Sequence, residues 1–177
     1  MNEEILAQID KKKAIYSWAL YDWANSAFAT TVMAGFLPDF FRNYYAVGLE
    51  SNTITTYLAL ANALASLIIV FLDPILGAIA DKMSGKKRFL TFFAFQGILM
   101  TGLLVVVAEG FWYWALLLYV LGTVGFSRAN TVYDSLLPAV ASEKKIDFVS
   151  SLGFSLGYIG GGLLFIVNVA MYMLMDD

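Results

Sequence analysis

Among the ionisable residues inside stretches that are otherwise apolar, three have types and positions that could do chemistry. Asp22 and Asp73 are carboxylates, and Arg128 is a guanidinium. A charge at the centre of a membrane-spanning helix costs about 2.5 to 3.5 kcal/mol on insertion scales, so such residues face protein or a wet cavity and tend to pair. They predict a site that binds a solute or carries a proton.

Asp22 and Arg128 form the predicted pair. Asp22 lies about eight residues, or about 12 Å, into the first apolar stretch, and Arg128 lies about eight residues before the end of the fourth. Their depths match and their charges are opposite, which favours pairing. A zwitterion such as an amino acid could then place its carboxylate against Arg128 and its amine against Asp22.

Smaller polar residues lie near Asp22 and near Arg128 on the same helices. Asn25 and Ser26 follow Asp22 at the i+3 and i+4 positions, so all three share one helical face, while Asn130 lies on a polar face of the fourth stretch. Such faces are typical of cavity linings. Hydrogen bonding between helices, or a shallow position that reaches water, explains the same residues and stays open as an alternative.

Asp73 directly precedes Pro74 in the second apolar stretch, at a depth similar to that of Asp22. Proline removes a backbone donor and loosens a helix. We therefore predict that Asp73 is a second candidate for carrying a proton. The alternative, that Asp73 is only a polar residue filling a helix kink, stays open.

The composition places these residues in a membrane protein. Hydrophobic residues make up 60 % of the 177 residues and charged residues 14 %, with a mean hydropathy of +0.72, whereas soluble domains are about 45 to 50 % apolar. The absence of Cys and His excludes disulfides, thiolate nucleophiles and histidine relays. We expect no metal site, no cofactor, no enzymatic activity and no nucleic-acid partner; the expected partners are the lipid bilayer and a small-molecule solute.

The predicted fold is an all-α integral membrane bundle over residues 14–177, after a cytoplasmic segment at residues 1–13. A helix needs about 20 apolar residues to cross a bilayer. Five stretches meet this requirement, at about 14–37, 55–80, 89–108, 112–136 and 148–174.

The basic residues predict a cytoplasmic N-terminus. With that orientation, nine of the 11 Lys and Arg residues fall on cytoplasmic segments, and only Arg42 falls on an external loop. The nine are Lys11, Lys12, Lys13, Lys82, Lys86, Lys87, Arg88, Lys144 and Lys145. A bacterial plasma (inner) membrane is the expected location.

The loop after the second stretch carries a recognisable pattern. "GAIADKMSGKKR" resembles the signature between the second and third spans of the major facilitator superfamily, with one extra residue between the aspartate and the second glycine. The resemblance implies a cytoplasmic gating loop made by Gly77, Asp81, Lys82, Gly85, Lys86, Lys87 and Arg88.

The fifth stretch contains "GFSLGYIGGGLL", which is similar to the glycine-rich signature of antiporters in that superfamily. Tyr158 stands where the signature has proline. Small residues four apart also allow close helix packing without any such resemblance. The glycines at the signature positions are Gly153, Gly157, Gly161 and Gly162.

Together with "LYDWANSAF" and "RANTVYDSLLP", these motifs resemble the branch of the superfamily related to the fungal vacuolar amino-acid effluxers and their bacterial relatives. The resemblance implies a secondary transporter of about twelve spans that works by alternating access, with proton coupling as the expected energy source. The chain would supply most of the N-terminal six-helix half.

Two alternatives to a transporter, or to its N-terminal portion, remain. One is a membrane subunit that does not transport and packs against partner helices. The other is a half-transporter that pairs with a second copy of itself if the chain is complete.

Overall fold

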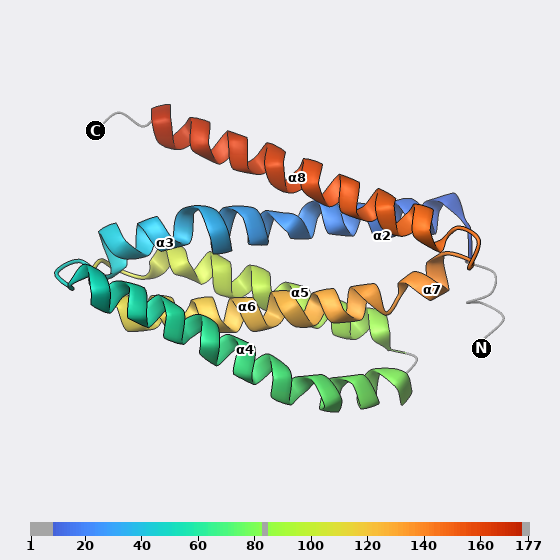
Figure 1. Ribbon diagram of the computed structural model, residues 1–177, viewed down its shortest axis with the longest axis horizontal. Helices are drawn as coiled ribbons and strands as arrows, with labels where there is room; N and C mark the ends of the chain where they lie inside the picture. Colours follow the sequence, from blue (N-terminus) through green and yellow to red (C-terminus); the bar gives the residue numbers. More distant parts are fainter. Residues whose placement is uncertain (1–8, 83–84, 175–177) are drawn as a thin grey trace. The chain divides into compact units, whose positions relative to one another are not determined.

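The computed structural model describes the backbone of residues 9–82 and 85–174, and the side chains of residues 9–74 and 85–174 (Figure 1). All regular structure in these ranges is helical. The elements are α2 (Lys12–Ala27), the π-helical η1 (Phe28–Phe36), α3 (Leu37–Phe40), the π-helical η2 (Phe41–Tyr45), α4 (Ser51–Lys82), α5 (Lys86–Leu103), the 3-10 turn η3 (Leu104–Val106), α6 (Trp112–Asp134), α7 (Leu137–Val140) and α8 (Ile146–Leu174).

Four helices in the described part of the chain are long and apolar enough to cross a membrane, at 51–74, 86–106, 112–134 and 146–174. They match the second to fifth predicted stretches. The first stretch, 14–37, falls on α2 and η1, where the hydrogen-bonding pattern changes from α to π. The protein is thus a helical membrane protein, while the fifth crossing and the cytoplasmic N-terminus stay predictions.

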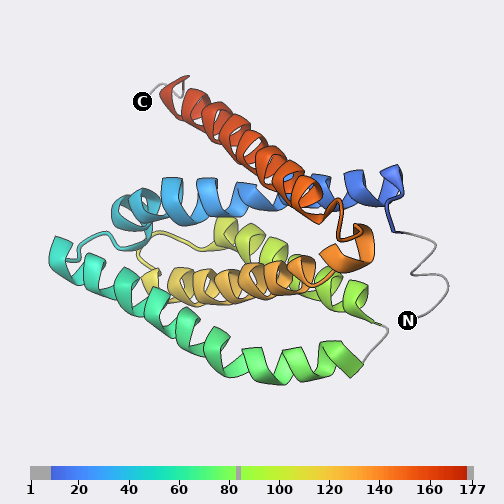
Figure 2. The ribbon, with the colours of Figure 1, turned by 45° about the vertical axis from the view of Figure 1, so that its right-hand side comes forward.

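Contacts divide the chain into two compact units, residues 1–36 with 133–177 and residues 37–132. In the first unit, α2 and η1 lie beside α8, as Figures 1 and 2 both show. The two helices run in the same direction, because contacts near Trp18 involve Gly153 and contacts near Thr30 involve Gly161. Three candidate spans separate them in the chain, so a parallel pair is what five crossings would produce.

Asp10 fastens the start of α2 to the loop before α8, within the first unit. Its backbone N–H donates to the Val140 carbonyl at 2.9 Å, and its carboxylate accepts bonds from the Ser142 N–H at 3.1 Å and the Ser142 hydroxyl at 2.9 Å. Lys145 Nζ lies 3.3 Å from the same carboxylate. The Ser142 backbone and side-chain bonds, with a smaller contribution from Lys145, hold the pKa of Asp10 below its usual value of 3.8.

In the second unit, α6 packs on α4 and α5. Tyr119 donates to Asn62 Oδ1 at 2.8 Å on the α4 side. On the α5 side, the backbones of Gly97 and Gly125 approach so closely that a Cβ on Gly125 would lie 2.9 Å from Gly97 N. Glycine allows this approach, and burial covers 56 % of the α6 window against 17 % in each of the other three spans. Helix α6 therefore supplies positions at which polar side chains are shielded from lipid.

Candidate functional site

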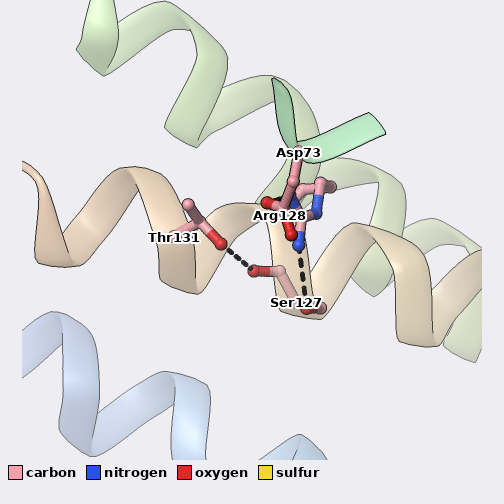
Figure 3. A network of polar contacts seen from close by, with 4 residues as sticks. All are labelled: Asp73, Ser127, Arg128 and Thr131. Atoms are coloured by element: carbon pink, nitrogen blue, oxygen red, sulfur yellow. Dashed lines mark hydrogen bonds and ion pairs between the residues drawn. The ribbon is translucent and has the colours of Figure 1, made fainter. Parts of the chain in front are cut away.

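Arg128 and Asp73 form an ion pair in the second unit. Arg128 Nη1 contacts Asp73 Oδ1, which joins α6 to α4 (Figure 3). The exposed fraction of the Arg128 side chain is only 3 %, whereas that of Asp73 is 47 %. A buried guanidinium needs a compensating charge in an apolar medium, and Asp73 supplies it from a side that remains open.

Neighbouring polar groups on α6 border this pair. Arg128 Nη2 lies 3.4 Å from Ser127 Oγ, and the Thr131 hydroxyl donates to the Ser127 carbonyl at 3.2 Å (Figure 3). Arg128 Nε is buried and has no hydrogen-bond partner in the described part of the chain.

The first unit holds a second polar position at the contact between α2 and α8. Asp22 and Ser26 are half-buried there and face Gly157, since a Cβ on that glycine would lie 2.8 Å from both Asp22 Oδ2 and Ser26 Oγ. The carboxylate thus rests against the backbone of α8. In this unit Asp22 and Ser26 therefore lie on one face of α2, which is directed at α8.

An aromatic cluster that the sequence did not predict lies in the same unit. The Trp18 and Tyr133 rings stack with their centroids 4.3 Å apart, and Tyr21 stacks on Tyr133 at 5.0 Å. Trp18 Nε1 donates to the Tyr133 carbonyl at 3.2 Å. The cluster depends on contacts between residues 115 positions apart, so no local spacing could have indicated it.

The remaining predicted binding residues lie on these helices. Asn25 is half-buried on α2, and Asn130 is half-buried on α6. Asp22 and Arg128 belong to different units, and Arg128 has Asp73 as its partner within its own unit. The pairing of Asp22 with Arg128 stays a prediction, while the pairing of Asp73 with Arg128 is new.

The predicted gating loop lies partly outside the described residues. Residues 83–84 are not described, and Gly77, Asp81 and Lys82 lie on α4 where only the backbone is described. Gly85 is the N-cap of α5, whose first turn contains Lys86, Lys87 and Arg88. Positive side chains oppose a helix dipole at an N-terminus, so another requirement, such as the positive-inside rule, must favour them here.

The predicted packing glycines differ in their surroundings. Gly153 and Gly157 face side chains of α2, and Gly161 faces Thr30 on η1, whereas a Cβ on Gly162 would have no neighbouring atom within 4 Å. Gly160, which was not predicted, packs instead: a Cβ there would clash with the Trp23 carbonyl oxygen. The α8 contact therefore uses Gly160 where the signature suggested Gly162.

Comparison with known proteins adds to this geometry. Residues 43–177 match the family described as Vacuole effluxer Atg22 like. Over 159 residues the chain is 40 % identical to an uncharacterized MFS-type transporter YxiO of Bacillus subtilis (strain 168), covering 89 % of this chain and 37 % of that protein. Over 153 residues it is 31 % identical to an uncharacterized protein of Aquifex aeolicus (strain VF5), covering 85 % of this chain and 36 % of that protein. The chain thus spans little more than a third of these relatives, and no solved structure matches.

Proposed function

Since the chain belongs to the Vacuole effluxer Atg22-like family, we propose that it forms part of a secondary active transporter that moves a small polar solute by alternating access. The MFS-type relative supports the transport class. The observation that carries the proposal is the ion pair of buried Arg128 with half-exposed Asp73 inside candidate membrane spans. Intramembrane charges of this kind are typical of solute and proton pathways.

Each charged position suits one chemical group of a solute. Arg128 in the second unit carries a guanidinium, which suits an anionic group such as a carboxylate. Asp22 in the first unit lies beside the Ser26 hydroxyl and suits a cationic group such as an amine. Amino acids, the solutes expected from the sequence, are our first candidates.

Proton coupling is the second part of the proposal, with Asp73 or Asp22 as the carrier. Asp73 neutralises Arg128 when ionised, so its protonation would release the guanidinium to a solute carboxylate. Proton and solute transport would then be coupled, because the Asp73 carboxylate and the solute carboxylate compete for the Arg128 guanidinium.

The test is transport by the native-length protein, purified from its own membrane and reconstituted into liposomes. Asp73→Asn is expected to retain exchange of labelled for unlabelled amino acid but to lose accumulation driven by a pH gradient. Arg128→Ala is expected to lose both activities. If both variants behave as the native protein with every amino acid tested, the proposal fails.

The second candidate is a half-transporter that works as a homodimer, or a membrane subunit that does not transport. The 177 residues correspond to 37 % of the Bacillus relative. The intact mass of the untagged protein from its native locus separates these readings, since a mass near 19.5 kDa would favour the second candidate. Transport by the purified 177-residue chain would exclude the non-transporting subunit.

A further inference from the structure

We infer that Gly157 is a positioning residue for Asp22: the missing side chain on α8 creates the space that the carboxylate occupies. The inference deepens the proposed function, because it concerns a residue that the proposal places in the solute or proton pathway. It assigns to Gly157 more than the close helix packing that any small residue would provide.

The contact geometry supports this role. A Cβ on Gly157 would lie 2.8 Å from Asp22 Oδ2, a distance that real Cβ atoms essentially never show, and 3.0 Å from Asp22 Cγ, which is a tight contact. Ser26 Oγ lies on the same side at 2.8 Å. Even an alanine would therefore move the carboxylate, the hydroxyl or the helix.

The other glycines of α8 face different groups. Gly153 lies against the rings of Trp18 and Tyr133, and Gly160 lies against the backbone and ring of Trp23. Gly157 alone among the α8 glycines with described contacts has a carboxylate at its Cβ position. Close packing of two helices explains the contacts of Gly153 and Gly160 with rings and backbone. It does not require the carboxylate that Gly157 faces.

The electrostatic surroundings of Asp22 lie in the same unit. Its titratable neighbours among the described residues are Tyr21 on its own helix, and Tyr133 and Asp134 at the end of α6. A displaced carboxylate would change its distance to each of these groups. The ionisation of Asp22 should therefore respond most to Gly157, which meets the carboxylate directly, and less to Gly153, which meets only its neighbour Tyr133.

The experiment measures the ionisation of Asp22 without relying on transport. A hydrophobic carbodiimide modifies protonated carboxyl groups, and mass spectrometry of the first-span peptide reports labelling of Asp22 as a function of pH. The native-length protein is compared with Gly157→Ala and two matched controls. Gly153→Ala introduces a packing clash one turn earlier, and Gly162→Ala adds a methyl group into open space.

Gly157→Ala is expected to shift the labelling midpoint by about one pH unit and to lower transport about tenfold, because functional groups need positions accurate to about 0.5 Å. Gly162→Ala should match the native protein, and Gly153→Ala should lower thermal stability with a smaller shift of the midpoint, because its Cβ meets Tyr133 and not Asp22. An unchanged midpoint in Gly157→Ala, or an equal shift in Gly153→Ala, would overturn the inference.

A second pair of variants covers the case in which Gly157→Ala does not fold. Ser26→Ala removes one of the two side chains that a Cβ at position 157 would meet. The double variant Ser26→Ala with Gly157→Ala is therefore compared with Ser26→Ala alone. We expect the same shift in the midpoint of Asp22 labelling, and its absence would contradict the inference. If Gly157→Ala shifts the midpoint but Asp22→Asn transports normally, the positioning role stands and the proposed function of Asp22 fails.

Discussion

At the scale of single residues, the two members of the intramembrane ion pair are unequal. Arg128 is almost fully buried, and Asp73 is about half exposed. Removing the Asp73 carboxylate leaves the buried Arg128 cation without its partner. Removing the Arg128 guanidinium leaves the Asp73 carboxylate, which can still be solvated from its exposed side. The two single substitutions should therefore differ in cost although they break the same contact.

We predict that Asp73→Ala lowers the free energy of unfolding by about 3 kcal/mol and that Arg128→Ala lowers it by less, because breaking a buried pair costs most when the buried charge remains. Thermal unfolding in detergent measures both. The double variant should be more stable than Asp73→Ala alone. An equal loss of unfolding free energy in Asp73→Ala and Arg128→Ala would contradict the argument that the more deeply buried charge costs more when it is left alone.

Asp10 gives a pH prediction at the same scale. Its folded pKa lies below 3.8, so its carboxylate contributes stability above that pH and loses it as the pH falls through the lowered folded value. Asp10→Asn should be less stable than the native protein at pH 7, with the difference narrowing below about pH 4. Thermal unfolding as a function of pH measures this, with the exposed Glu143→Gln as the loop control. A difference that stays constant with pH would exclude an ionic contribution.

At the scale of elements, four of the five apolar stretches predicted as spans are confirmed as long apolar helices, because hydropathy and length alone decide that property. The change to π-helix at η1 was not predicted. Within it, the Thr30 hydroxyl lies 3.1 Å from the Ser26 carbonyl and 3.2 Å from the Gly161 carbonyl on α8. A contact across 131 residues leaves no trace in local periodicity.

The contact between α5 and α6 supplies the prediction for elements. A Cβ on Gly125 would lie 2.9 Å from both Gly97 N and the Phe93 carbonyl oxygen, and backbone atoms cannot rotate away. Gly125→Ala should therefore lower the free energy of unfolding by about 1 to 3 kcal/mol. Gly102→Ala, with nothing within 4 Å, serves as the control and should be neutral or slightly stabilising. Equal melting temperatures for the two variants would contradict the close approach.

At the scale of the whole molecule, the distribution of basic residues and the direction of the helices are both consistent with five crossings that begin in the cytoplasm. The basic residues predict a cytoplasmic N-terminus, and α2 runs parallel to α8 with three candidate spans between them in the chain. The site was harder to predict, because Asp22 and Asp73 have similar depths and either could have met Arg128. Which acid does so depends on the face that α6 presents to α4, and depth along a helix carries no such information.

The absence of cysteine makes the topology directly testable. With the N-terminus inside, Leu49→Cys and Glu109→Cys should react with a membrane-impermeant maleimide on intact cells. Glu143→Cys should react only after the cells are opened. Labelling of Glu143→Cys on intact cells would reverse the predicted orientation.

The pairing of α2 with α8 also bears on the order of biosynthesis. Thr30 meets Gly161, which the ribosome adds 131 residues later, an interval of roughly 7 to 26 s at about 5 to 20 residues per second. During that time Asp22 lacks its neighbour on α8. A chain released before α8 is complete would leave the polar face formed by Asp22 and Ser26 uncovered.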